Sequence, residues 1–262
     1  MRVNQTRERL SQGETVFGSG LQVYRSPEIP RTFAAAGFDY VFIDMEHGAF
    51  DLETVQDMIK ASLDSGITPI VRVCELLYSL CARLLDAGAQ GIILPRVEDP
   101  VLMKEAMSWL RFPPVGKRGY GVNPTMIGYE GRNFHEIIEH QNRNTLAVVQ
   151  FESTTAVERA DELLSVPGLD IIMVGPADLS ISLGVPGQFE HPLLVSTVDR
   201  IIEKCKHHGV VPGIQVRTVA MAKFWADRGM RFIGAGAEHA LLLEKSRETV
   251  SQLRAARAAQ PA

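Results

Sequence analysis

The chain has 262 residues, of which 45% are apolar and 22% charged, an ordinary composition for a globular protein. Its formal charge of −4 and pI near 6.0 argue against a nucleic-acid partner or an anionic membrane surface. No apolar run approaches the ~18 residues of a membrane span, and residues 1–13 lack the apolar stretch of a signal peptide. The three cysteines form no C-x-x-C pair, so we expect reduced thiols in a cytoplasmic protein.

Short strand-like runs alternate with longer helix-like segments along the whole chain. The expected strands are residues 16–22, 40–44, 69–73, 91–97, 146–151, 170–174, 210–216 and 231–235. The expected helices are residues 28–36, 52–65, 77–87, 101–110, 155–166, 194–208, 218–228 and about 240–259. Most of these strands are apolar nearly throughout, as when both faces of a sheet are covered. Eight strand–helix units in roughly 250 residues predict a single (β/α)8 TIM barrel domain spanning residues 1–262.

Two irregular stretches, residues 111–144 and 178–193, interrupt this alternation. Loops of such length in a compact domain are usually lids or binding loops. No G-x-G-x-x-G motif follows the first expected strand, which weakens a dinucleotide-binding interpretation.

The segment Asp44-Met45-Glu46-His47-Gly48 directly follows the apolar run 40–43. Three ionisable groups after a buried strand are costly to place there for stability alone. At the carboxyl end of a strand in an α/β protein, such a cluster more often performs chemistry. His47, oriented by a neighbouring carboxylate, is therefore a candidate general base. The alternative is a histidine hydrogen-bonded near a helix N-terminus.

The other strand ends supply further polar groups, and in a barrel all eight ends converge on one mouth. From the third strand to the eighth these groups are Arg72; Pro95 and Arg96; Gln150 and Glu152; Gly175, Pro176, Ala177 and Asp178; Gln215 and Arg217; and Gly234, Gly236 and Glu238. The two carboxylates Glu152 and Asp178 suit Mg²⁺ or Mn²⁺. The alternative is that one of them pairs with an arginine of the mouth.

Arg72 lies inside a β-rich run and needs an anionic partner there. A substrate carboxylate or enolate oxygen would serve, and a structural salt bridge to Glu46 or Asp44 is the alternative. The turn at residues 175–180 offers backbone N–H groups for a carboxylate. No lysine occupies an expected strand end, which counts against a Schiff-base mechanism.

Six segments together carry a family resemblance. They are residues 37–47 (GFDYVFIDMEH), 71–73 (VRV), 84–91 (LLDAGAQG), 112–119 (FPPVGKRG), 150–152 (QFE) and 175–180 (GPADLS). With these motifs the chain resembles the HpcH/HpaI aldolase family, the metal-dependent (class II) pyruvate aldolases. The resemblance extends from Gly18 through Gly236.

The resemblance implies roles for the strand-end residues. Glu152 and Asp178 would bind the divalent ion (Mg²⁺, Mn²⁺ or Co²⁺), and Arg72 would contact the keto oxygen of pyruvate. His47, paired with Asp44, would be the catalytic base. The remaining expected substrate contacts are the backbone around Gly175, Pro176 and Ala177, together with Gln150 beside the metal and Gln215 near the variable end of the substrate.

The resemblance also implies an assembly. Asp86 matches a family aspartate that approaches the active site from a neighbouring subunit, although a helix-surface carboxylate is the alternative. Family members are hexamers, built as trimers of dimers with exchanged C-terminal helices, and residues 241–259 are expected to form such a helix. Glu238 departs from the family pattern, where we expect aspartate.

These observations predict an enzyme that reversibly cleaves a 4-hydroxy-2-oxo acid to pyruvate and an aldehyde. One alternative is a related enolate-using lyase or synthase, either citrate-forming or acting on a CoA thioester. A second alternative, of a different class, is an oxo-acid-binding barrel without turnover.

Overall fold

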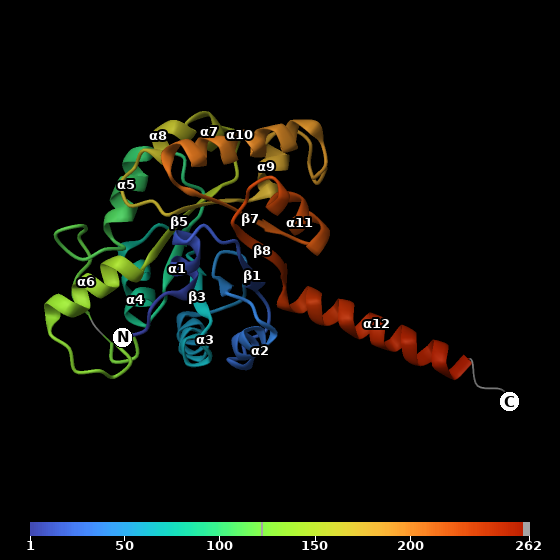
Figure 1. Cartoon of the computed structure of the whole chain (residues 1–262), viewed down its shortest axis with the longest axis horizontal. Helices are drawn as coiled ribbons and strands as arrows, with labels where there is room; N and C mark the ends of the chain where they lie inside the picture. The colour runs from blue at the N-terminus through green and yellow to red at the C-terminus, as the bar shows by residue number, and fades with distance from the viewer. Residues whose placement is uncertain (122, 259–262) are drawn as a thin grey trace.

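Eight parallel strands close into a barrel in the computed structural model, which describes residues 1–121 and 123–258. Each strand pairs with the next along the chain, and β1 also pairs with β8 (Figure 1). The strands are β1 (Val16–Leu21), β2 (Tyr40–Asp44), β3 (Thr68–Arg72), β4 (Gly91–Leu94), β5 (Leu146–Phe151), β6 (Ile171–Val174), β7 (Val211–Val216) and β8 (Phe232–Ala237). The predicted (β/α)8 barrel is confirmed.

Helices follow the strands and cover the outside of the barrel (Figure 1). Those that correspond to predicted helices are α2 (Glu28–Ala36), α3 (Leu52–Ser65), α4 (Tyr78–Asp86), α5 (Pro100–Ser108), α7 (Thr154–Glu158), α8 (Ala160–Leu164), α10 (Pro192–His208), α11 (Val219–Asp227) and α12 (Glu238–Ala258). Three further helices, α1 (Gln5–Ser11), α6 (Phe134–Asn144) and α9 (Pro176–Ser182), lie outside the predicted helix ranges.

Two of the differences between predicted and observed boundaries have clear local reasons. Strand β4 ends at Leu94 rather than residue 97, because Pro95 has no N–H to donate and Arg96 turns the chain with φ of 53°. The helix predicted over residues 155–166 is divided into α7 and α8 at Arg159, whose ψ of 15° departs from helical geometry. Ala259, the last residue of the final predicted helix, lies outside the described residues.

The strands contribute side chains to two separate hydrophobic cores, because alternate side chains point to opposite faces of the sheet. On β2, Val41 and Ile43 pack with the surrounding helices, whereas Tyr40 and Phe42 belong to a second cluster inside the barrel. Leu10 of α1 joins this inner cluster. Moving along β2 toward its carboxyl end, the next inward position after Phe42 is Asp44. The alternation that fills the barrel with apolar groups therefore places a carboxylate at its mouth.

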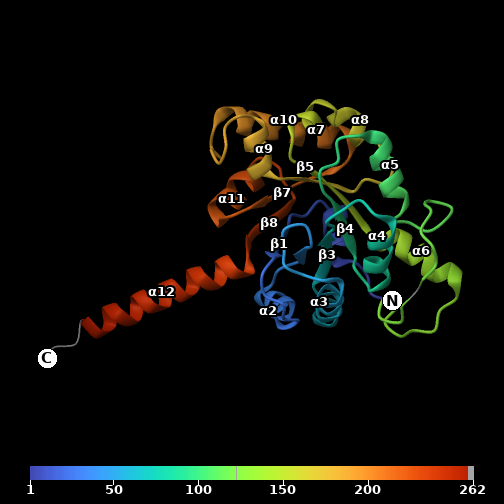
Figure 2. The same ribbon diagram turned by 180° about the vertical axis from the view of Figure 1, so that it is seen from behind.

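Helix α12 extends away from the barrel in both views (Figures 1 and 2). Its buried residue is Glu238, and large apolar side chains are exposed along it at Leu242, Leu243, Val250 and Leu253. Among the described residues, no helix has the length and apolarity needed to cross a membrane. The three cysteines are unpaired, with Cys74 exposed and Cys81 and Cys205 buried.

Candidate active site

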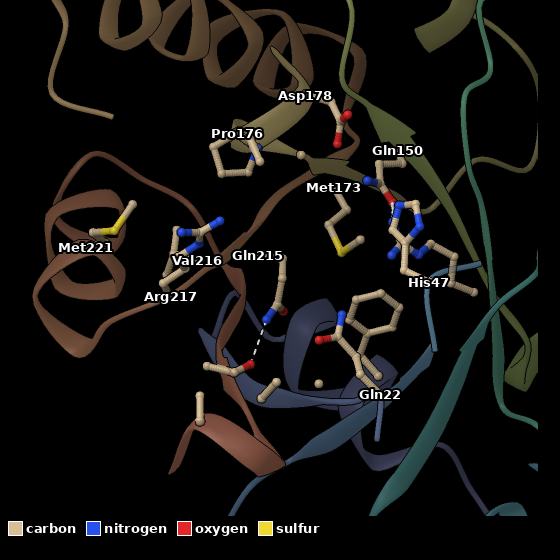
Figure 3. A pocket seen from close by; sticks show the side chains of 18 of the residues that line it. Gln22, His47, Gln150, Met173, Pro176, Asp178, Gln215, Val216, Arg217 and Met221 are labelled. Carbon is tan, nitrogen blue, oxygen red and sulfur yellow. Dashed lines mark hydrogen bonds between the residues drawn. The ribbon is translucent and has the colours of Figure 1, made fainter. Parts of the chain in front are cut away.

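A pocket of about 550 Å³ opens where the strands end, and most of the predicted site residues line it or lie beside it. Figure 3 shows Gln215 near its centre, with His47 and Gln150 on one side and Arg217 on the other. Every second side chain of a strand points into the barrel, and these inward side chains are apolar within the barrel and polar at the strand ends. The polar side chains of different strands therefore meet at the pocket. Arg72 faces Asp44 directly in the β2–β3 register. The mouth is thus built from the polar ends of otherwise apolar strands.

Arg72 and Asp44 form a buried bidentate pair. Nε of Arg72 donates to Oδ1 of Asp44 at 3.0 Å, and Nη2 donates to Oδ2 at 2.6 Å. Nη1 lies 3.0 Å from Oε2 of Glu46 and donates to Oε1 of Gln150 at 3.1 Å. Burial opposes ionisation of Asp44, but Arg72 and Gln22 hold the pKa of this carboxyl below its ordinary 3.8. The salt bridges considered from the sequence are present, and they fix the guanidinium in a pocket that it also lines.

The Asp44→Asn variant should lose about 3 kcal/mol of unfolding free energy at neutral pH, because a buried guanidinium loses its main counter-charge. Since the folded-state pKa of Asp44 is lowered, its stabilising contribution is present above pH 3.8 and is lost as the pH falls below that value. Urea denaturation from pH 7 to pH 3 should therefore show the two proteins converging at acidic pH. An equal gap at every pH would contradict this assignment.

His47 lies at the rim of the pocket with its side chain 53% exposed. Its backbone N–H donates to Oδ1 of Asp44 at 3.2 Å, while its imidazole Nε2 is 3.9 Å from Oε2 of Glu46. The contact with Asp44 therefore runs through the backbone of His47, because Arg72 and Gln22 already occupy the carboxylate oxygens. A tight turn brings the segment back on itself: a Cβ on Gly48 would lie 2.0 Å from the Asp44 carbonyl oxygen.

Glu152 directly follows β5, and Asp178 lies in α9, which follows the adjacent strand β6. Oε1 of Glu152 accepts from the backbone N–H of Arg96 at 3.0 Å, and Oε2 accepts from Nε2 of Gln150 at 2.6 Å. The unusual backbone of Arg96 thus aims an N–H at this carboxylate. Asp178, in the first turn of α9, lines the pocket itself.

The charges around Glu152 fit a divalent cation. Burial, and then the neighbouring carboxylates of Glu46 and Asp178, raise the pKa of Glu152. A cation would relieve both the burial cost and the repulsion. Within residues 1–121 and 123–258, no three His, Cys, Asp or Glu side chains are arranged to hold a metal. An ion would therefore depend on the two carboxylates, with water and substrate oxygens completing its shell.

Gly175 keeps space open beside this carboxylate. A Cβ there would lie 2.8 Å from Nε2 of Gln150 and 3.1 Å from Oε2 of Glu152. Gln150 cannot yield freely, since it is buried and bonded to both Arg72 and Glu152.

We expect Gly175→Ala to lower kcat/KM by about tenfold to a hundredfold while costing about 1–3 kcal/mol of stability. Gly131→Ala is the matched control, because a Cβ at Gly131 meets nothing within 4 Å. Steady-state kinetics and thermal unfolding of both variants test this expectation. Equal activity of the two would show that the space beside Glu152 has no importance.

Asp86 ends α4 and forms an ion pair with the buried Arg118 at 2.6 Å. Burial outweighs Arg118 and raises the pKa of Asp86. Asp86 is not among the described residues that line the pocket of its own chain. Its predicted role accordingly requires a neighbouring subunit.

Two residues that support the site were not singled out from the sequence for this role. Nε2 of Gln22 donates to Oδ2 of Asp44 at 2.9 Å. The buried carboxylate of Glu238 accepts from the backbone N–H groups of Gln22 and Tyr24 at 2.9 and 3.0 Å, and from that of Val23. Gln22 was the last residue of the first predicted strand. The expectation that polar groups at strand ends line the mouth could therefore have identified it. Glu238 was predicted as a strand-end group and as a departure from the family pattern, but not as the anchor of residues 22–24.

Fold and site together define a TIM-barrel enzyme whose mouth combines a fixed guanidinium with two carboxylates suited to a divalent ion. Residues 22–244 match the family model described as HpcH/HpaI aldolase/citrate lyase. The chain belongs to this family, and it is a lyase of the class II pyruvate aldolase type.

Individual relatives agree with this assignment. A hydroxypyruvate/pyruvate aldolase of Roseobacter denitrificans is 32% identical over 252 residues, covering 95% of this chain and 97% of that protein. A 2-keto-3-deoxy-L-rhamnonate aldolase of Salmonella gallinarum is 31% identical, covering 92% of this chain and 90% of that protein. The crystal structure of an HpcH/HpaI aldolase from Desulfitobacterium hafniense superposes with a TM-score of 0.90 at 29% identity, covering 97% of both chains.

Proposed function

We propose that this chain, acting as one barrel domain, reversibly cleaves a 4-hydroxy-2-oxo acid to pyruvate and an aldehyde with the help of a divalent metal ion. The observation that carries the proposal is the position of Arg72. Its guanidinium is held on two sides by Asp44 and Glu46 and linked through Gln150 to Glu152. The Arg72 guanidinium and the Asp178 carboxylate line one small pocket, and the Glu152 carboxylate lies beside its lining residue Gly175. An oxo acid in this pocket could contact the guanidinium and an ion held by the two carboxylates.

Glu152 and Asp178 would hold the ion, for which Mg²⁺, Mn²⁺ and Co²⁺ are the candidates. When bound, it supplies positive charge next to the 2-oxo and carboxylate oxygens of the substrate. Both residues offer hard oxygen donors, as these ions require.

Arg72 would donate to the 2-oxo oxygen, where negative charge develops as the C3–C4 bond breaks. Its orientation costs nothing during the reaction, because Asp44 already fixes it in the resting protein. The substrate carboxylate would lie against the backbone around Gly175, Pro176 and Ala177, which line the pocket. Gln215 would contact the rest of the substrate chain.

His47 would take the proton from the C4 hydroxyl, directly or through a water molecule. Its half-exposed position leaves room for such a water, and Glu46 is the carboxylate near its imidazole. Asp44 would support it indirectly, by holding the backbone of residues 46 and 47.

The assembly would complete the site. We propose a hexamer, a trimer of dimers, in which α12 packs on a neighbouring subunit and Asp86 reaches a neighbouring pocket. The row of exposed apolar side chains on α12 supports such packing, since isolated helices rarely leave these exposed.

The decisive experiment is a retro-aldol screen in which released pyruvate is detected with lactate dehydrogenase. A panel of 4-hydroxy-2-oxo acids would be tested with Mg²⁺, Mn²⁺ and Co²⁺, before and after EDTA treatment. We expect pyruvate release that EDTA abolishes and added metal restores. Full activity after complete metal removal would refute the proposal. Citrate formation from oxaloacetate without pyruvate release would instead favour a citrate-forming enzyme, and oxo-acid binding without any product would indicate a binding protein.

A further inference from the structure

A second cavity lies at the opposite end of the barrel from the candidate active site. Its volume is about 350 Å³, and its polar lining includes Arg7, Ser11, Asp170 and Arg231. Asp170 directly precedes β6 and Arg231 directly precedes β8, so this basal cavity lies at the amino ends of the strands. Catalysis in TIM barrels takes place at the carboxyl ends. A ligand in the basal cavity would therefore be separate from the reaction.

The side chains that line the basal cavity or contact Asp170 carry an excess of positive charge. Nη1 of Arg7 lies 2.7 Å from Oδ1 of Asp170, and Nη2 of the buried Arg111 donates to Oδ2 at 3.1 Å. Arg231 lines the same cavity, and among the described residues no carboxylate lies within ion-pair distance of it. Three guanidiniums thus share one carboxylate, which leaves two positive charges without a counter-charge.

The two guanidiniums that line the basal cavity also keep unused hydrogen-bond donors. The only group of Arg7 with a protein acceptor is Nη1, which donates to the carbonyl of Thr145 at 3.3 Å and faces the carboxylate. The corresponding group of Arg231 is again Nη1, which donates to the carbonyl of Leu10 at 3.1 Å. In the part of the chain that the structure describes, Nε and Nη2 of both arginines meet no protein acceptor. Nη1 of the buried Arg111 likewise has no partner there.

We propose that the basal cavity binds a phosphate group between Arg7 and Arg231, either as free phosphate or as the monoester of a small molecule. Such a group carries about two negative charges at neutral pH, which matches the excess of two positive charges. Its oxygens can accept from both guanidiniums, whose forked donors suit phosphate. Burial lowers the pKa of Arg111, and Arg7 lowers it further while Asp170 opposes both. A bound anion would relieve this crowding of like charges.

The test is isothermal titration of the full chain with inorganic phosphate, glycerol 3-phosphate and succinate, all at one ionic strength. We expect saturable binding of a phosphate compound, and the tighter of the two identifies the source of the group. Arg231→Met should weaken this binding at least about tenfold. This change removes one of the two lining guanidiniums but leaves the contacts of Asp170 with Arg7 and Arg111 in place. Succinate binding as tight as that of both phosphate compounds would overturn the assignment to phosphate.

Ser11→Glu provides a second variant of the basal cavity. Ser11 is exposed and lines the cavity, so the new carboxylate would repel phosphate while all three arginines remain. It should also weaken binding at least about tenfold.

Arg217→Met is the matched control, because Arg217 lines the active-site pocket at the other end of the barrel. This variant should bind phosphate as the wild type does. Absence of saturable binding, or unchanged affinity in both Arg231→Met and Ser11→Glu, would overturn the inference. Loss of binding in Arg217→Met alone would place the phosphate in the active-site pocket and would overturn it as well. The titrations require no turnover, so the aldolase proposal is judged separately by pyruvate release.

Discussion

Replacing Arg72 by methionine should reduce kcat by about 10³, because in the proposed mechanism the 2-oxo oxygen would lose the donor that faces its developing charge. The same change leaves Asp44 and Glu46 without the cation between them, although Arg96 still pairs with Glu46. We therefore also expect a loss of about 3–5 kcal/mol in unfolding free energy. Pyruvate release and urea denaturation measure the two effects separately.

Arg72→Lys separates charge from geometry. Lysine keeps the positive charge but cannot form the bidentate contact with Asp44, so it should recover stability more than activity. Arg96→Met is the matched control for removal of a mouth arginine, since the Arg96 side chain is 66% exposed and its backbone contact to Glu152 survives substitution. Near-normal turnover in folded Arg72→Met would remove this residue from the reaction.

Replacing Glu152 by glutamine should weaken Mn²⁺ binding at least about a hundredfold and reduce kcat/KM on the order of 10³. Glutamine preserves the shape of the side chain but removes the charge that a divalent ion would neutralise. Isothermal titration with Mn²⁺ and the pyruvate assay provide independent readouts.

The control for this change is Glu203→Gln on α10, where an exposed glutamate pairs with Lys206. This variant should bind Mn²⁺ and release pyruvate as the wild type does. If Glu152→Gln bound Mn²⁺ with unchanged affinity, the metal would have to be held elsewhere, and the proposed ligand pair would be wrong.

The barrel was predictable because its strands are buried on both faces and separated by helices of regular length. The apolar pattern predicted element boundaries less well where a single backbone conformation ends a strand or a helix. The turn at Arg96 and the break at Arg159 depend on single backbone conformations, which apolar patterns do not encode. Helix α6 was missed because it is largely polar and lies within an insert.

The site residues that lie at the ends of strands could be predicted from the sequence. Arg72 and Asp178 line the pocket, and Gln150 bridges Arg72 and Glu152, because the inward period of two brings the strand ends to one mouth. The partner of His47 was not predictable, since it depends on how the turn after β2 folds back. The role proposed for Asp86 would depend on a second subunit, and the position of a second subunit does not follow from strand ends in one chain.

Glu238 joins two parts of the molecule that are distant in sequence. It begins α12, yet its carboxylate anchors the loop after β1, and Gln22 of that loop supports Asp44. A chain of hydrogen bonds therefore connects the start of the projecting helix, through three backbone amides and the Gln22 carboxamide, to the Asp44–Arg72 pair. Docking of α12 on a neighbour would consequently stiffen the reaction centre as well as assemble the oligomer.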